Sequence, residues 1–298
     1  MSFDSSWKTN SYFVFVDKPV GPTSHDELKS FKRALKIKKL GHHGSLDPFA
    51  SGLLLVGVNE ATKFFQFVED DFKTYAAVLK LGEATDTLDH TGQVVKTAAL
   101  PDWTEKDLAR IAQEFTGDRQ QIPPMYSAKK VDGKKLCDLA RKGIEIKREP
   151  ITIHIHSLEL KAEQNNHISF VARVSRGTYI RVLGEQIAEA LGTVGHLTAL
   201  RRTELCDLSD DLALDWREDQ WDCQKQIGIA DLLKHLPALE CTEKQSSALK
   251  NGQFLTLSEL PVPLANGDLF RLFEDNQFFG VGERKGPVLK AKRLLSTN

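Results

Sequence analysis

The stretch Gly41-His42-His43-Gly44-Ser45-Leu46-Asp47-Pro48-Phe49-Ala50-Ser51-Gly52 places one carboxylate, Asp47, among small and turn-forming residues. Its glycines allow tight turns and the close approach of another backbone. Pro48 favours an extended conformation at Asp47, which holds the carboxylate in one direction. The apolar residues 53–58 follow and predict a buried strand. The stretch therefore indicates either a functional acid on a stiff loop or a turn aspartate that caps its own loop.

The composition is that of an ordinary globular protein. The chain has 298 residues, of which 41% are hydrophobic and 27% charged, enough for one large domain or a large and a small one. It contains no apolar run of about 18 residues and no signal-peptide pattern, so we expect a soluble, cytoplasmic protein. Its four cysteines form no C-x-x-C pair, so we expect reduced thiols and no metal site.

Charge is unevenly distributed, although the net charge is only −1. Residues 28–46 carry six Lys or Arg and no acid, and residues 125–149 carry eight basic residues against four acidic ones. Residues 204–222, in contrast, carry eight acids. Basic patches beside a candidate site favour contact with a phosphate backbone. Each run taken alone fits a solvated helix face equally well.

Hydrophobic periodicity predicts interleaved strands and helices. A capping box of Ser24 and Glu27 predicts a helix through Ile37, and Leu236 to Asn251 reads as another helix. The predicted strands are 12–16, 53–58, 73–81, 151–157, 167–175 and 196–204, and further helices are 104–115 and 180–191. Three short strands, 269–273, 278–281 and 288–294, predict a small C-terminal β module.

Some polar residues are candidates for function. Arg181 falls in the first turn of a predicted helix, where a cation gains nothing from the helix dipole, so we expect it to pair with a carboxylate such as Asp47. Tyr75 is either a core aromatic or a residue that reaches the site. The acidic loop 81–92 lacks a second carboxylate cluster that would complete a metal shell. His154 and His156 fit the polar face of an amphipathic strand better than a metal-ligand pair.

Several blocks, in this order, resemble the bacterial tRNA pseudouridine synthase B family. The match to residues 41–52 is extended by Asp17-Lys18-Pro19, Ala61-Thr62-Lys63, the loop 81–92, Pro123-Pro124-Met125-Tyr126-Ser127-Ala128, Arg176-Gly177-Thr178-Tyr179-Ile180-Arg181 and Leu197-Thr198-Ala199-Leu200-Arg201-Arg202-Thr203. These blocks span about residues 12–205. The tail resembles, more weakly, the family's PUA-like module. The chain departs from the family at His43, where threonine is usual.

The resemblance implies an α+β fold, with a mixed, largely antiparallel sheet, flanking helices and an RNA-binding cleft. It implies a catalytic domain over residues 1–235 and a C-terminal PUA-like RNA-binding domain over residues 236–298. We expect a monomer that binds the T-arm of tRNA and needs no cofactor or metal.

The resemblance also implies roles for individual residues. Asp47 would be the catalytic nucleophile, and Arg181 would pair with it and keep it ionised by lowering its pKa. Tyr75 would lie against the target base. His42 would occupy the gap left when the base is flipped out of the RNA. The remaining RNA-binding residues implied are Lys18, Leu200, Lys63 and Tyr179.

The implied reaction is the isomerisation of uridine 55 in the T-loop of tRNA to pseudouridine. Two alternatives stay open at this point. One is a pseudouridine synthase of the same fold that acts on another RNA. The other is a tRNA-binding and refolding protein whose isomerisation is incidental.

Overall fold

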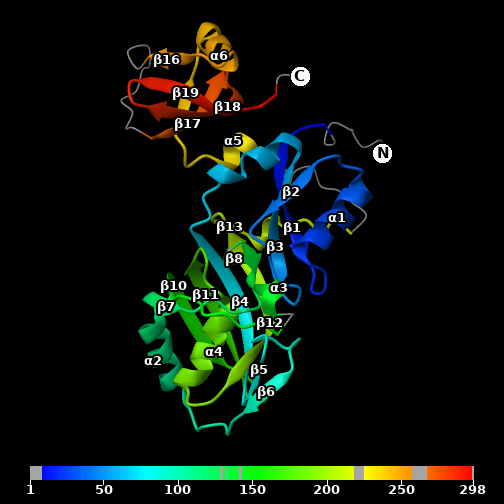
Figure 1. Ribbon diagram of the computed structural model, residues 1–298, viewed down its shortest axis with the longest axis vertical. Helices are drawn as coiled ribbons and strands as arrows, with labels where there is room; N and C mark the ends of the chain where they lie inside the picture. The colour runs from blue at the N-terminus through cyan, green and yellow to red at the C-terminus, as the bar shows by residue number, and fades with distance from the viewer. Residues whose placement is uncertain are drawn as a thin grey trace.

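The computed structural model describes residues 9–127, 130–131, 133–140, 143–217, 225–256 and 267–296 (Figure 1). Ala128, which ends one of the family-like blocks, and Cys223 lie outside the described residues. No helix within the described ranges is long and apolar enough to cross a membrane.

A large mixed sheet forms the centre of the protein. Its strands run in the order β14-β1-β3-β12-β4-β11-β10-β7, with β2 paired to β3 and β13 paired to β12. Every pairing is antiparallel except the short one between β3 and β12. The strands are β1 (Tyr12–Lys18), β2 (Leu40–His43), β3 (Ser51–Val58), β4 (Phe72–Leu81), β7 (Gly117–Gln121), β10 (Ile151–Ala162), β11 (His167–Ser175), β12 (Gly195–Leu205), β13 (Leu208–Ser209) and β14 (Ile227–Gly228).

Two amphipathic helices cover one end of this sheet (Figure 1). They are α2 (Glu105–Phe115), which begins at a Thr104–Asp107 capping box, and α4 (Ile180–Ala190). Their apolar stripes pack with alternate residues of β4, β11 and β12 into one core cluster. The 3.6-residue period of the helices and the two-residue period of the strands predicted this core. The α+β fold class predicted for the chain is confirmed by its solved structural relatives, described below.

Helix α1 (Ser24–Leu35) packs on the other end of the sheet and begins differently from the prediction. Its N-cap is Thr23, whose side chain accepts a hydrogen bond from the Asp26 N–H. Glu27 is buried instead and accepts a hydrogen bond of 2.6 Å from Trp216 Nε1. The predicted capping box of Ser24 and Glu27 is therefore wrong, because both side chains form hydrogen bonds with residues far along the chain, Ser24 with Leu46 and Glu27 with Trp216. Two 3₁₀ turns, η2 (Asn59–Lys63) and η3 (Phe65–Phe67), follow β3.

A second sheet, in the order β15-β17-β18-β19-β16, forms the C-terminal module with its own core. Val281 and Phe278 also join the core cluster of β1 and β3, so the module packs against the larger sheet. The predicted helix over Leu236–Asn251 is only partly right, because its first residues form β15. The elements are β15 (Ala238–Glu240), α6 (Glu243–Lys250), β16 (Phe254–Thr256), β17 (Leu269–Glu274), β18 (Gln277–Lys285) and β19 (Val288–Leu294).

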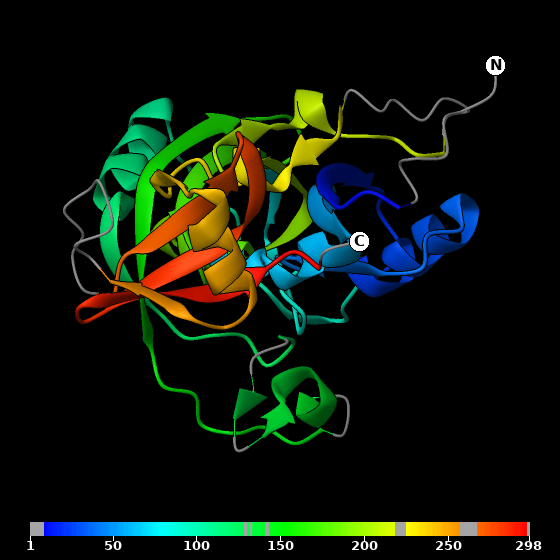
Figure 2. The ribbon, with the colours of Figure 1, turned by 90° about the horizontal axis from the view of Figure 1, so that it is seen from above.

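Small elements complete the structure. Figure 2 shows that the green segment around residues 130–140 projects from the body of the protein. This segment contains β8 (Lys130–Val131), β9 (Lys134–Lys135) and α3 (Leu136–Ala140). The remaining elements are β5 (Glu83–Thr85), β6 (Val94–Thr97), η4 (Asp210–Leu212) and α5 (Ile229–Leu232).

Candidate active site

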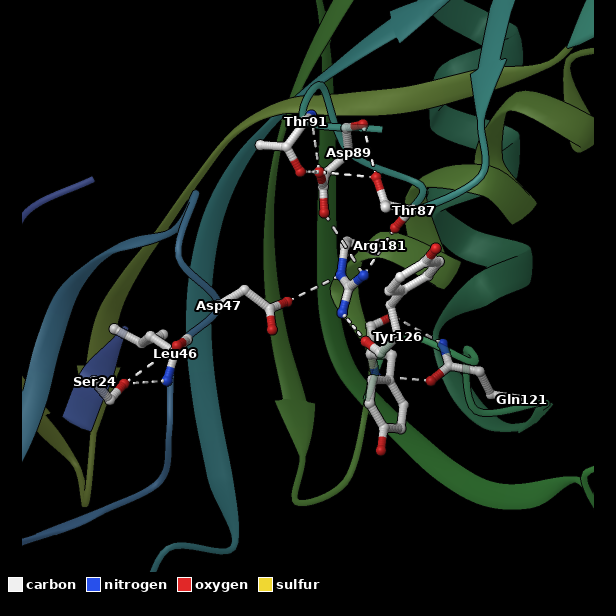
Figure 3. Close-up of polar contacts among 10 residues, drawn as sticks. Ser24, Leu46, Asp47, Thr87, Asp89, Thr91, Gln121, Tyr126 and Arg181 are labelled. Atoms are coloured by element: carbon white, nitrogen blue, oxygen red, sulfur yellow. Dashed lines mark hydrogen bonds and ion pairs between the residues drawn. The ribbon is translucent and has the colours of Figure 1, made fainter. Parts of the chain in front are cut away.

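The loop between β2 and β3 presents Asp47 (Figure 3). The Ser24 hydroxyl accepts a hydrogen bond of 2.8 Å from the Leu46 N–H and lies 3.2 Å from the Leu46 carbonyl oxygen. After Asp47 the chain turns, and the Ala50 N–H donates to the Asp47 carbonyl oxygen at 3.1 Å. These bonds fix the backbone on both sides of Asp47.

Arg202, which was not predicted as a site residue from the sequence, forms hydrogen bonds with both ends of this loop. Its side chain is 1% exposed. Its Nε donates to the Leu53 carbonyl oxygen at 2.7 Å, and one terminal nitrogen donates to the Gly44 carbonyl oxygen at 2.7 Å. The Arg202 backbone also approaches Gly52 so closely that a Cβ there would lie 2.2 Å from the Arg202 oxygen, and Gly52 has a φ of +99°. Only glycine fits at this position.

Arg181 faces Asp47 from the first turn of α4. Its Nε lies 2.9 Å from Asp47 Oδ2. Its terminal nitrogens donate to the carbonyl oxygens of Thr87 at 2.8 Å and Tyr126 at 2.7 Å. The Arg181 side chain is 5% exposed, whereas the Asp47 side chain is 42% exposed. A buried, fixed cation thus holds a carboxylate that remains accessible, and the predicted pairing of these two residues is present.

Asp89 is a second anion beside Arg181, and its role was missed from the sequence. Its Oδ2 lies 3.6 Å from an Arg181 terminal nitrogen. Its Oδ1 accepts hydrogen bonds from the Thr87 hydroxyl at 3.0 Å and from the Thr91 N–H at 3.0 Å (Figure 3). The acidic loop 81–92 could have indicated this role, but from the sequence it was considered only as a possible metal site. No cluster of three or more potential metal ligands occurs within the described part of the chain.

The pKa of Asp47 differs from the expectation. The loss of surrounding water raises the pKa of Asp47 above its ordinary value, and this effect exceeds the opposing attraction of Arg181. The nearby negative charge of Asp89 raises the pKa further. Arg181 lowers the pKa of Asp47, as expected, but burial outweighs it, so the pKa lies above its ordinary value and not below it. Arg181 limits the rise instead.

Lys18 supports the same loop from the end of β1. It is fully buried, and its ammonium donates to the carbonyl oxygens of Pro19 and Pro22 at 2.8 Å and of Pro48 at 3.4 Å. Burial lowers the pKa of Lys18 to about 8. Lys18 therefore braces the residue that follows Asp47, and its charge attracts the Asp47 carboxylate.

Tyr75 and Leu200 line the sheet beneath the loop. Both belong to the core cluster that contains Leu46 and Phe49. They lie on paired strands, because Leu200 is opposite Ala77 and Tyr75 is opposite Arg202. Tyr179 caps α4, and Gln121 holds it with hydrogen bonds to its N–H at 2.7 Å and its carbonyl oxygen at 3.1 Å.

The other two predicted RNA-binding residues lie on the β2 side. His42 is on β2, opposite Val56 of β3, and its Nδ1 is buried with no hydrogen-bond partner. Burial lowers the pKa of His42. Lys63 is at the end of η2, where it forms an ion pair with Glu60. Of the eight predicted site residues, the structure brings Asp47 and Arg181 into direct contact and places Lys18, Tyr75 and Leu200 around their loop.

Comparison with known proteins assigns the chain to a family. Residues 32–180 match the N-terminal domain of the TruB family pseudouridylate synthases, and residues 237–295 match the C-terminal domain of pseudouridine synthase II TruB. A tRNA pseudouridine synthase B from Hydrogenovibrio crunogenus is 41% identical over 98% of this chain and 96% of its own length. The chain belongs to the TruB family. One from Azoarcus is 40% identical over 95% of this chain and 94% of its own length. The family predicted from the sequence blocks is confirmed.

Solved structures show the same fold. A chain in a crystal structure of a Cbf5–Nop10–Gar1 complex superimposes with a TM-score of 0.72 at 23% identity, covering 98% of this TruB chain and 87% of its own. A chain in a structure of an H/ACA ribonucleoprotein bound to a substrate RNA containing 2′-deoxyuridine superimposes with a TM-score of 0.70 at 21% identity. The match covers 96% of this chain and 85% of that one. These likenesses extend the TruB fold assignment over nearly the whole chain.

Proposed function

We propose that this protein is a tRNA pseudouridine(55) synthase, an isomerase that converts uridine 55 in the T-loop of tRNA to pseudouridine. The observation that carries the proposal is the accessible Asp47 carboxylate held 2.9 Å from the buried Arg181. Family membership, with curated relatives named tRNA pseudouridine synthase B, supports tRNA as the substrate.

The chemistry suits a single carboxylate. The reaction breaks the N1–C1′ glycosidic bond and joins C5 to C1′, while C5 loses a proton and N1 gains one. Its atoms balance with no outside group and no change in redox state. A carboxylate can attack or stabilise an electrophilic sugar carbon, and Asp47 has this role in the proposal. Arg181 keeps the carboxylate oriented and limits the rise in its pKa.

The remaining residues bind the RNA in this proposal. Tyr75 and Leu200 enclose the flipped uracil, because both line the sheet beside the Asp47 loop. Tyr179 contacts the RNA from the start of α4. His42, whose Nδ1 has no partner in the protein, fills the gap in the T-loop. Lys18 holds the loop through Pro48, and Lys63 contacts the phosphate backbone.

We propose that residues 1–235 form the catalytic domain and residues 236–298 a PUA-like RNA-binding domain. The separate core of the C-terminal sheet supports this division. The enzyme acts as a monomer on the T-arm, in the cytoplasm, without a metal or another cofactor.

Tritium release tests this function. A tRNA transcript labelled with tritium at C5 of uridine loses the label to water when C5 becomes attached to the sugar. We expect release by the wild-type protein and none by Asp47→Asn, although that variant still binds the transcript. If both proteins bind the transcript but neither releases tritium, the proposal that this protein is an enzyme is overturned. If tritium is released only from another RNA, the assignment of tRNA as the substrate is overturned.

A further inference from the structure

Asp70 lies outside the candidate site, yet it is buried at the meeting point of three segments. Asp70 is 4% exposed and lies two residues before the start of β4. Its Oδ2 lies 2.9 Å from His43 Nε2 and 3.0 Å from Lys73 Nζ, and its Oδ1 lies 3.6 Å from an Arg176 terminal nitrogen. One carboxylate therefore contacts β2, the start of β4 and the turn between β11 and α4.

Each of these segments carries a candidate site residue. His43 is next to His42, Lys73 is two residues before Tyr75 on β4, and Arg176 begins the turn that leads to Tyr179. The turn is held to the same place by its backbone, because the Arg176 N–H donates to the Asp71 carbonyl oxygen at 2.9 Å.

The anchoring of β2 depends on His43. Among the described strands, β2 pairs only with β3, so no strand is hydrogen-bonded to its other edge. The His43 ring stacks on Phe65 with ring centroids 5.7 Å apart and planes at 22°. Its contact with Asp70 is thus a polar link between β2 and the segment that leads into β4.

The Asp70 carboxylate is a permanent anion in this setting. Burial raises its pKa, but hydrogen bonds from His43 and Lys73 outweigh burial and lower the pKa to about 2. Loss of the charge would leave Lys73, which is 12% exposed, without its carboxylate. An ionised Asp70 therefore complements the groups that the three segments direct at it.

We propose that Asp70 is a positioning residue for the isomerisation, and that His43 is the partner through which it fixes the strand bearing His42. The proposal rests on the proposed function, because the three segments are those assigned to hold the uridine. Asp70 acts through these segments, since its own carboxylate is too buried to meet the RNA.

Asp70→Asn tests the positioning role against a matched control. The control is Asp118→Asn, which removes another aspartate that contacts a histidine, His154, at 2.7 Å, on an exposed part of the sheet. For Asp70→Asn we expect kcat to fall by about 10-fold to 100-fold, the range that a small misplacement of reacting groups produces. KM for tRNA should change less than kcat, because the Arg176 side chain, which is 71% exposed, remains available to attract phosphate. Asp118→Asn should match the wild type.

Hydrogen exchange of the free protein supplies a readout independent of activity. In Asp70→Asn, peptides covering residues 40–46 and 172–181 should exchange faster, while those of α2 should not change. If the wild type has no isomerase activity but the exchange is faster in Asp70→Asn, the proposed function is overturned, whereas the finding that Asp70 holds the three segments stands. Unchanged exchange and kcat in an active enzyme would overturn the positioning role alone.

A pair of His43 variants keeps the test decisive if Asp70→Asn does not fold. His43→Leu retains an apolar contact with Phe65 but donates no hydrogen bond, whereas His43→Gln retains an N–H donor for Asp70. We expect His43→Gln to restore most of the kcat lost in His43→Leu. Equal rates for the two variants, or a loss of rate explained wholly by a lower Tm, would overturn the proposal.

Discussion

Arg181 Nε lies 2.9 Å from Asp47 Oδ2, but Arg181 does not depend on Asp47 for its position. The carbonyl oxygens of Thr87 and Tyr126 hold its terminal nitrogens, and Asp89 lies beside it. The arginine is thus fixed before substrate arrives, which is the preorganisation that electrostatic catalysis requires.

Removal of the Arg181 charge should change both the rate and its pH dependence. Arg181 opposes the rise in the pKa of Asp47, so Arg181→Met should raise that pKa further. Because the proposed reaction uses ionised Asp47, the acid limb of the pH–rate profile should move to higher pH. The rate on the plateau should fall by about 100-fold to 1,000-fold. Single-turnover rates between pH 5 and about 9 measure both effects. An acid limb that stays in place would show that Arg181 does not tune Asp47.

Asp47→Asn should increase stability while it abolishes activity. Because the pKa of Asp47 is raised in the folded state, folding favours the protonated carboxyl, and stability is lost as the pH rises through that pKa. An asparagine avoids this loss, so Tm at pH 7 should be higher than that of the wild type. The difference should shrink as the pH falls through the raised pKa of Asp47, because wild-type Asp47 then gains its proton. A lower Tm for the variant at pH 7 would contradict the assignment of burial as the dominant effect.

Asp89→Asn should impair catalysis through Arg181. The variant keeps an acceptor for Thr87 and Thr91 but removes the charge beside the guanidinium. We expect kcat to fall by about 10-fold to 100-fold, because Arg181 is oriented less tightly. Asp86→Asn is the matched control, since Asp86 is exposed in the same loop and accepts from the Gln93 N–H. Steady-state kinetics with equal losses in both variants would indicate a general defect of the loop.

RNA binding should depend on salt through the basic residues of α1 and the segment that follows it. Lys32, Lys36 and Lys39 are all exposed there. Neutralising all three with glutamine should reduce the slope of log affinity against log salt by about 2 to 3, in proportion to the phosphates contacted. Lys106→Gln on α2, at the other end of the sheet, should leave the slope as it is. An unchanged slope for the triple variant would remove this patch from the RNA footprint.

The sequence was most informative where local rules and packing agree. Alternating residues of β4 and the stripe of α4 were predicted correctly, because each buries one face. The place of Asp89 beside Arg181 was not predictable. It depends on loop 82–92 folding against β12, where the Leu197 N–H donates to the Leu88 carbonyl oxygen at 3.0 Å. The capping prediction for Ser24 failed for the same reason, because its hydroxyl forms hydrogen bonds with the backbone of Leu46, 22 residues away.

The pKa of Asp47 shows the same limit of sequence reasoning. A neighbouring arginine could be expected from its position in α4, but the amount of water lost by the carboxylate could not. That quantity depends on how the loop, α4 and Lys18 enclose Asp47 together.

The most direct test is a map of pseudouridine at nucleotide resolution in unmodified tRNA and in an isolated T-arm stem-loop, after incubation with the wild-type protein or Asp47→Asn. We expect one pseudouridine, at position 55, in both RNAs with the wild type and none with the variant. Pseudouridine at another position, or an equal yield from Asp47→Asn, would contradict the assignment of substrate and nucleophile.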